Sequence, residues 1–353
     1  MPQPRTTRLL IRGQYDQPGE AVLPGIPSAI APWPAEAPRN RLGLAAWLIN
    51  DANPLTARVA VNRLWQQCFG EGLVRTMNDF GTQGETPTHP ELLDWLAITF
   101  RESGWDVKAT LRMIVHSRTY RQESRFRTEK DALFDPQNRL LARGPRFRMS
   151  AEMIRDQALA AAGLLQREIG GPSVKPYQPP GLWEEVSYNA EDTYVPDVDG
   201  GLWRRSLYTW LKRQAPPPPF LAFDGTTREK CTIQRARTNT PLQSLILLND
   251  PTFVEAARVL ASELLQTESD EPQRRITMFR RILSRSPDDP ELRLLTDLLQ
   301  RQRQRFRESP EDAELLVTTG ASARDHQTDA GELAAWTVLA HTLFNLDEAI
   351  TRR

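Results

Sequence analysis

The chain has 353 residues, of which 39% are hydrophobic and 25% are charged, so it can bury a core as one large domain or two ordinary ones. Its 45 basic and 45 acidic residues give a formal net charge of zero, and no bulk field attracts nucleic acid or an anionic membrane. Cys68 and Cys231 define no disulfide framework, metal motif or c-type haem motif, and the longest apolar runs, such as Leu242–Leu248, are too short to span a bilayer.

The first 40 residues are predicted to form a junction segment, the remnant of a preceding domain. Thr6–Gly13 has the pattern of a short strand that ends at a glycine. Gln14–Pro38 is rich in proline and glycine, which is typical of an ordered loop or the remnant of a hairpin. A strand with no earlier partner indicates a truncated start. Arg41–Asn50 then shows the first helical pattern.

A run of capped helices is expected over Asn53–Ser117. Asn53 followed by proline is a favourable helix start, because asparagine caps free N–H groups and proline suits the first turn. Thr88 and Glu91 have the spacing of a capping box, and Asp106 is placed to cap the next helix. Since caps and apolar faces account for most of these residues, the run is interpreted as scaffold rather than as an active site.

A loop-rich region, residues 166–239, follows a helix that is predicted to start at Ser150. Gly170–Gly201 holds many turn formers, and a loop of this length is usually functional, disordered or attached to a core. Pro216–Pro219 is interpreted as a stiff, non-helical connector, because consecutive prolines favour an extended backbone. The charged stretch Arg121–Phe134 is expected to be another loop.

Helices are expected again from Thr240 onward. Pro241–Leu248 forms one, the pair Asp250-Pro251 starts the next, and Asp329 with Glu332 has capping-box spacing for the last. The predicted fold class is therefore mainly α, a multi-helix orthogonal bundle with long irregular loops rich in proline and glycine and a few short strands. Residues 41–353 form one helical domain in this prediction, which could subdivide into 41–165 and 240–353.

The densest group of polar side chains lies in Phe223–Gln243, an irregular stretch between two structured regions. Loops held by a scaffold commonly bind ligands, and the arginines here could hold a carboxylate, sulfate or phosphate. The alternative is a buried network that ties the proline connector to the helices, with Asn239 and Thr240 capping the next helix. The candidate ligand-binding residues of this stretch are Asp224, Arg228, Glu229, Arg235, Arg237 and Asn239.

Two further candidates, Asp79 and Glu85, lie in a turn that the neighbouring helices explain poorly, and this turn is predicted to contribute to the same site. Cys231 could act as a nucleophile only with a partner close in space, so it is interpreted as a buried, inert thiol. The four histidines are scattered, and no metal site is predicted. No catalytic residue is assigned, and whether the chain is an enzyme stays open.

Three long segments carry a family resemblance. Asn53–Gln122 contains Asn-Pro-Leu-Thr-Ala-Arg-Val and Thr-His-Pro-Glu-Leu-Leu-Asp-Trp-Leu, Phe223–Arg258 contains Arg-Glu-Lys-Cys-Thr and Arg-Thr-Asn-Thr-Pro-Leu-Gln-Ser-Leu, and Leu333–Arg352 ends in Phe-Asn-Leu-Asp-Glu-Ala-Ile-Thr-Arg. In these motifs the chain resembles the planctomycete surface domain family. Domains of that family have no known function, and they lie at the C-terminal end of long exported proteins, behind a cytochrome-c-like haem domain.

The resemblance implies an extracytoplasmic protein, in the periplasm or at the cell surface. Met1–Arg5 lacks the apolar stretch of a signal peptide, so a complete chain would instead be cytoplasmic. No cofactor is expected in this chain, and a haem c only in a neighbouring domain. The first hypothesis is a non-catalytic binding or assembly module of an exported redox or polysaccharide-processing protein, partnered by a cytochrome-c-like domain or a polysaccharide. The alternative is an enzyme or ligand-binding domain for sulfated or acidic polysaccharide. Nucleic acid is not expected as a partner.

Overall fold

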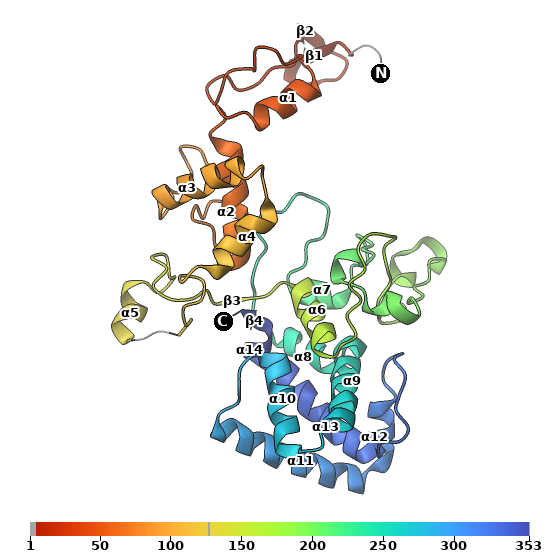
Figure 1. The fold of residues 1–353 in the computed structure, drawn as a ribbon. Coiled ribbons are helices and arrows are strands. Elements are labelled where there is room, and N and C mark those ends of the chain that lie inside the picture. Colours follow the sequence, from red (N-terminus) through yellow and green to blue (C-terminus); the bar gives the residue numbers. More distant parts are fainter. Residues whose placement is uncertain (1–4, 126–127, 353) are drawn as a thin grey trace. The chain divides into compact units, whose positions relative to one another are not determined.

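The computed structural model describes residues 5–125 and 128–352 and divides into two compact units, Met1–Pro145 (unit 1) and Arg146–Arg353 (unit 2) (Figure 1). Within the described residues, fourteen α-helices and two two-stranded sheets form the regular structure, which confirms the mainly α fold. In the same part of the chain, none of the helices combines the length and the apolar character that crossing a bilayer would demand. The predicted boundaries at residues 41, 165 and 240 stay a prediction.

Unit 1 starts with a small hairpin and continues with helices. The predicted first strand does find a partner, since Thr7 lies opposite Val22 of the antiparallel strand that follows. The elements of unit 1 are β1 (Thr7–Leu10), a 3₁₀ turn η1 (Ile11–Gly13), β2 (Pro18–Val22), α1 (Arg41–Leu48), α2 (Leu55–Phe69), α3 (Pro90–Glu102), α4 (Val107–His116) and α5 (Glu129–Phe134).

The prediction of a loop over Arg121–Phe134 is wrong in its second half, where α5 forms. The residues of α5 include glutamate, lysine, alanine and leucine, which have high helix propensity, so local preference here outweighs the polar composition. Residues 126–127 of that stretch lie outside the described residues.

The core of unit 1 lies among α2, α3 and α4. Val61 and Trp65 of α2 pack in one cluster with Leu93 and Leu96 of α3 and Ile114 of α4, and none of the five is more than 6% exposed. These positions recur at helical spacing, so burial of one face of each helix holds the three together. The run predicted from its caps and apolar faces therefore forms a packed helical core.

Two predicted caps are present at the helix starts of unit 1. The Asn53 side chain accepts from the backbone N–H of Leu55 at 3.0 Å, and the Asp106 carboxylate accepts from the N–H of Ala109 at 2.9 Å. Each bond satisfies a donor that has no partner inside its own helix. Local sequence chemistry therefore determines where α2 and α4 begin.

The capping box predicted at Thr88 and Glu91 is wrong. The cap residue of α3 is His89, whose side chain makes no capping bond. The Thr88 hydroxyl donates instead to the carbonyl of Leu73, which also accepts the Thr88 backbone N–H at 2.9 Å. The Thr88 hydroxyl also lies 3.0 Å from His89 Nδ1, so its hydrogen bonds are made to Leu73 and His89 and not to the first-turn N–H groups of α3.

Unit 2 contains most of the helices and a second, two-residue ladder. In that ladder Phe147 lies opposite Arg352, so the start and end of the unit are paired. The elements of unit 2 are β3 (Phe147–Arg148), α6 (Ala151–Ala161), the 3₁₀ turns η2 (Glu184–Val186), η3 (Tyr188–Ala190), η4 (Asp199–Trp203) and η5 (Ser206–Tyr208), α7 (Pro218–Ala222), α8 (Pro241–Asn249), α9 (Pro251–Thr267), α10 (Glu271–Leu283), α11 (Asp289–Glu308), α12 (Pro310–Val317), α13 (Ala330–Phe344), α14 (Asp347–Ile350) and β4 (Thr351–Arg352).

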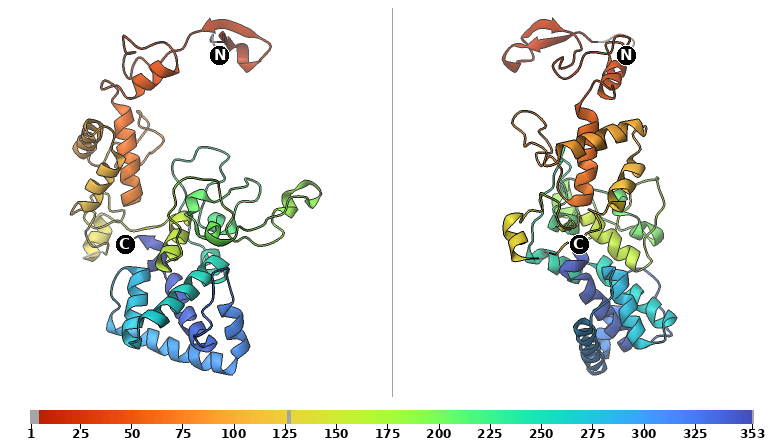
Figure 2. Two further views of the ribbon diagram at one scale, coloured as in Figure 1. Left: turned by 45° about the vertical axis from the view of Figure 1, so that its right-hand side comes forward. Right: turned by 60° about the vertical axis from the view of Figure 1, so that its left-hand side comes forward.

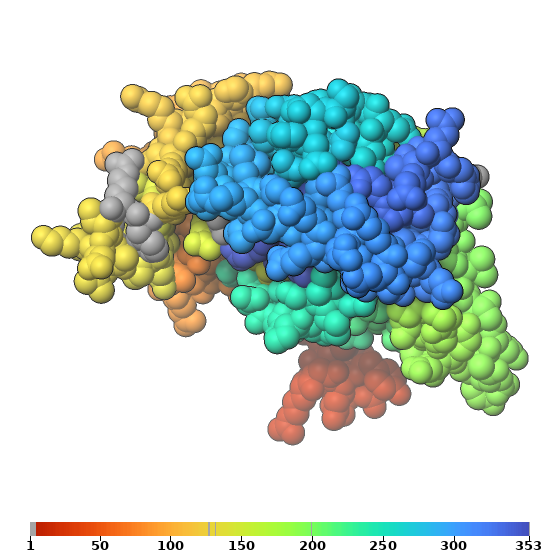
Figure 3. Space-filling model, turned by 90° about the horizontal axis from the view of Figure 1, so that it is seen from below, coloured from red at the N-terminus to blue at the C-terminus, as the bar shows by residue number. Residues whose placement is uncertain are grey.

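Helix α13 is the centre of unit 2. Its side chains Leu333, Trp336 and Leu339 are fully buried, and they share one cluster with Ala256 and Leu260 of α9. Because α13 is apolar around most of its circumference, it needs neighbours on several sides, and α9, α10, α11 and α12 supply them. Figure 3 shows α10 and α11, in cyan to blue, on the outer surface of this unit.

Two predictions for unit 2 need correction. Pro216–Pro219 is not wholly an extended connector, because α7 starts at Pro218. The first-turn N–H groups of a helix have no intrahelical acceptor, so a proline there removes no hydrogen bond of the helix. The capping box at Asp329 forms only by half: the Asp329 carboxylate accepts from the Glu332 N–H at 2.9 Å, but the Glu332 carboxylate accepts from Arg303 and from Trp336.

A long irregular segment, residues 166–215 (the central segment), connects α6 to α7. It carries only short turns and isolated bridges, such as Gln166 with Arg204 and Val174 with Thr209. Both views of Figure 2 show it, in green, beside α6 and α9. Side chains on those helices hold it: the Asp156 carboxylate accepts from the Ser206 N–H at 2.8 Å.

Candidate functional site

The polar loop, Phe223–Gln243, joins α7 to α8 and is fixed at its base. The Asp224 carboxylate pairs with the Arg148 guanidinium and accepts from both the backbone N–H and the hydroxyl of Thr238, at 2.9 and 3.0 Å. The Gln243 amide donates to the carbonyls of Ala222 and Thr238, at 2.9 and 3.0 Å. Asp224 adopts a left-handed backbone with φ of 58°, a strained conformation that these contacts maintain.

Two arginines of the loop also have partners. Arg235 pairs with Glu152 of α6 at 2.7 Å. Burial of Glu152 opposes its ionisation, but the hydrogen bond and charge of Arg235, with hydrogen bonds from the backbone and from Ser150, outweigh that effect and hold the pKa of Glu152 below its ordinary value. The Arg237 guanidinium lies 4.7 Å from the centre of the Phe147 ring. The base and the returning arm of the loop are thus attached to unit 2 by charged contacts.

Every residue of the tip of the polar loop, residues 227–234, is exposed. It carries Arg228, Glu229 and Lys230, and Arg228 has a left-handed backbone with φ of 63°. Among the described residues, no carboxylate pairs with Arg228 or Lys230. The prediction that Cys231 is buried is wrong, because its free thiol is exposed at the tip. The polar loop therefore combines a fixed base with a solvated, mainly cationic tip.

Three predicted residues remain, Asn239 in unit 2 and Asp79 and Glu85 in unit 1. Asn239 is exposed, and Thr240 is the cap residue of α8 without a side-chain bond, so the predicted capping by these side chains is wrong. Asp79 and Glu85 belong to unit 1. The Asp79 carboxylate accepts from the Gly81 N–H at 2.8 Å within its own turn, and Glu85 pairs with Arg139 at 3.2 Å.

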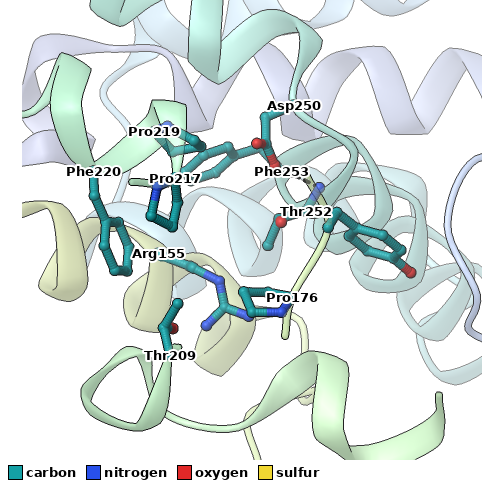
Figure 4. Close-up of a pocket in the computed structure, with 10 residues that line it drawn as sticks. Arg155, Pro176, Thr209, Pro217, Pro219, Phe220, Asp250, Thr252 and Phe253 are labelled. Atoms are coloured by element: carbon teal, nitrogen blue, oxygen red, sulfur yellow. Dashed lines mark hydrogen bonds between the residues drawn. The ribbon is translucent and has the colours of Figure 1, made fainter. Parts of the chain in front are cut away.

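Sequence reasoning missed a second group of polar side chains, which lines a small cavity in unit 2. Arg155 of α6 is 5% exposed, and it donates to the carbonyl of Arg204 at 3.0 Å, to the Ser206 hydroxyl at 3.1 Å and to the Leu202 carbonyl. Figure 4 shows its guanidinium between Thr209 and Pro176. All these acceptors come from the central segment, so one buried cation fastens that segment to α6.

One feature of the sequence points to this role for Arg155. Ala151 and Ala158 lie one turn before and after it on α6, and both are buried. A charged residue on the apolar face of a helix must find partners, since an unpaired buried charge is very costly. The position of the partners, about 50 residues further along, depends on the tertiary structure.

The charges around the cavity perturb one another. Burial lowers the pKa of Arg155, and the nearby carboxylates Asp156 and Asp250 oppose that effect. Burial likewise raises the pKa of Asp250, against its hydrogen bonds from Thr252 and the charge of Arg155. Shifted pKa values of this kind often mark active sites, but they also occur in structural networks. The cavity measures about 20 Å³, which is far too small for an organic substrate.

Within residues 5–125 and 128–352, no group of three or more histidine, cysteine or carboxylate side chains could hold a metal ion. Cys68 is buried in unit 1 and Cys231 is exposed in unit 2, and within the part of the chain that the structure describes neither forms a disulfide. Polar side chains gather in unit 2 at the polar loop and at the cavity, and also in ion-pair clusters such as that of Arg303 with Glu271 and Glu332.

Comparison with known proteins gives one match. The model of a family described as PSD1, protein of unknown function (DUF1553), matches residues 40–299, which is most of the chain. Neither the curated proteins nor the solved structures contain a match to this chain.

Proposed function

We propose that this chain, which belongs to the PSD1 family of proteins of unknown function (DUF1553), is a binding module and that the tip of its polar loop recognises an acidic polymer, a sulfated or uronate-rich polysaccharide. The observation that carries the proposal is the fixed base beneath an exposed tip with unpaired cations. A loop whose ends are already ordered loses little entropy when it binds. Exposed guanidinium and ammonium groups can bind sulfate or carboxylate without first breaking an internal ion pair.

The charge of the loop supports an anionic ligand. Arg228, Lys230 and Arg237 face solvent there, against the single exposed carboxylate of Glu229. The whole chain has no net charge, so this local excess of cations is a feature of the loop and not of the composition. Arg228 is favoured as the central contact, because its left-handed backbone is a strained state, and such strain is often found at binding sites.

Binding is favoured over catalysis by the state of the carboxylates. A glycosidase needs two carboxylates, one of them able to carry and release a proton. The Asp224 carboxylate is already occupied by Arg148 and Thr238, and its two oxygens accept hydrogen bonds from three donor groups. Glu229 is then left without a second carboxylate in the loop. The enzyme alternative would therefore have one uncommitted carboxylate in the loop, Glu229, and no second one to act with it.

An affinity test on the full chain addresses the proposal. The chain is applied to an array of sulfated, uronate-rich and neutral glycans, together with single-stranded DNA as an unrelated polyanion. The double variant Arg228→Ala, Lys230→Ala is expected to bind the acidic glycans roughly threefold to thirtyfold more weakly, because two exposed charge contacts are lost.

The matched control removes two other exposed arginines of unit 2, Arg280 on α10 and Arg293 on α11, which form no ion pair within the described residues. The variant Arg280→Ala, Arg293→Ala changes net charge by the same amount and should bind as the unchanged chain does. Equal losses in both double variants would mean that only overall charge matters. Binding of DNA as tight as that of the glycans would contradict selectivity for polysaccharide.

We further propose that the module works outside the cytoplasm next to a haem-bearing domain of a redox or polysaccharide-processing assembly. The motive is the resemblance of three long segments to domains found in such proteins, and the haem would belong to the neighbouring domain. Co-purification of this chain with a family cytochrome-c-like domain, against a cytochrome from an unrelated protein as control, tests the idea. No enrichment over the control would contradict it.

A further inference from the structure

We propose that the cavity between α6, α7, α9 and the central segment is a binding site for one water molecule, held by Arg155 and Thr209. The cavity is lined by apolar groups of Pro176, Pro217 and Phe220 on several sides, and by Arg155, Thr209 and Asp250. This hydration site is independent of the polar loop and of any ligand bound there.

Two buried polar atoms face this cavity without a partner. Within the described residues, neither Arg155 Nε nor the Thr209 hydroxyl has a hydrogen-bond partner. Both residues are more than nine-tenths buried, at 5% and 7% exposed. Figure 4 shows the two side chains next to each other at the cavity. An unsatisfied buried donor is costly, and ordered water is the usual partner where protein atoms are absent.

The volume of the cavity limits the size of the molecule that it can hold. It measures about 20 Å³, and a single water molecule needs roughly 10–15 Å³ on the same measure. A second water does not fit well, and sulfate, phosphate and organic groups are excluded by size. Water can accept from the Arg155 Nε–H and form a hydrogen bond with the Thr209 hydroxyl, which gives it two of the two to four partners that buried waters have.

The charges select a neutral ligand. The Arg155 guanidinium already lies 3.8 Å from the Asp156 carboxylate, and Asp250 also lines the cavity. An added anion would meet the carboxylate of Asp250 with no unpaired cation to offset it, and an added cation would meet the guanidinium. Water satisfies both open hydrogen bonds without adding charge. It completes the contacts by which Arg155 holds the central segment on α6.

A crystal structure of the full chain, at a resolution that resolves other buried waters, tests the site. We expect one density peak within hydrogen-bond distance of both Arg155 Nε and the Thr209 oxygen. The peak should persist in Thr209→Ser, which keeps the hydroxyl, and in Thr337→Val, a buried threonine whose hydroxyl is already bonded to Leu333. It should be lost in Thr209→Val. A dry cavity, or an anomalous peak after a bromide soak, would overturn the proposal.

Thermal unfolding gives a second, independent test, because Thr209→Val should shift the melting temperature in opposite directions with and without a bound water. With a bound water, Thr209→Val removes a partner of that water and lowers the melting temperature by about 2–4 °C. Without water, the same change replaces an unsatisfied buried hydroxyl with a methyl group and raises the melting temperature. A higher melting temperature in Thr209→Val than in the unchanged chain therefore overturns the hydration site.

Discussion

Replacing Arg155 with methionine should release the central segment from α6. The substitution removes three hydrogen bonds, to Leu202, Arg204 and Ser206, and it leaves the Asp156 carboxylate without its guanidinium. Breaking a buried, paired charge by removing one partner costs about 3–5 kcal/mol. For a unit of this size, that loss lowers the melting temperature by about 6–20 °C.

Denaturant unfolding of the full chain and hydrogen exchange measure this effect together. The reporters are the N–H of Ser206, bonded to Asp156 at 2.8 Å, and the N–H of Val174, bonded to the Tyr208 carbonyl at 2.8 Å. Both should exchange faster in Arg155→Met, because the segment that they belong to is no longer fastened. Arg155→Lys keeps the charge but not the forked geometry, so an intermediate loss is expected.

A loss of stability below about 1 kcal/mol in Arg155→Met would refute this account of the central segment. So would unchanged exchange at the two reporters beside a large drop in global stability, since the arginine would then support the helical core and not the segment.

Three further changes have defined outcomes. Asp224→Asn should lower the free energy of unfolding by about 1–3 kcal/mol, because it leaves the partly buried Arg148 guanidinium without its carboxylate. Trypsin should then cut the polar loop faster, and an unchanged cleavage rate would contradict this. Burial lowers the pKa of His341, so protonation of this side chain disfavours the folded state. As the pH drops below 6.5, the ordinary pKa of histidine, the free energy of unfolding should therefore decrease by up to about 1.4 kcal/mol per pH unit. In His341→Gln, measured by denaturant titration across pH, this part of the fall should vanish. A maleimide should label Cys231 in the native chain and Cys68 only after unfolding, and two native labels would contradict the burial of Cys68.

Local chemistry in the sequence predicts most of the helical fold. Asn53, Asp106 and Asp250 each cap a helix as their residue type and neighbours predict. The apolar spacing that follows each cap predicts which face is buried. These signals act over one or two turns, so they can be read without knowledge of the rest of the chain.

The predictions that fail involve contacts between distant parts of the chain. Thr88 has a good capping sequence, but a carbonyl 15 residues earlier takes its hydroxyl. Pro218 begins a helix where a run of prolines predicts an extended chain. Neither outcome follows from local propensity. A tertiary contact decides the first, and the position of proline in the first turn of a helix decides the second.

In the candidate site, too, local features can be predicted from the sequence and contacts between distant residues cannot. That the Phe223–Gln243 stretch is polar and irregular follows from its composition, but which of its arginines are paired does not. Arg235 and Arg228 are alike in sequence, yet one pairs with Glu152 and the other is exposed. The partners of Arg155 lie about 50 residues away, so no spacing rule identifies them.

Calorimetric titration of the full chain with a sulfated oligosaccharide of defined length, at several salt concentrations, tests whether the tip of the polar loop binds acidic polysaccharide. We expect saturable binding that weakens as the salt concentration rises and is weakened further by Arg228→Ala with Lys230→Ala, but not by Arg280→Ala with Arg293→Ala. Binding that is absent at low salt, or that both double variants retain in full, would contradict the role of the loop tip.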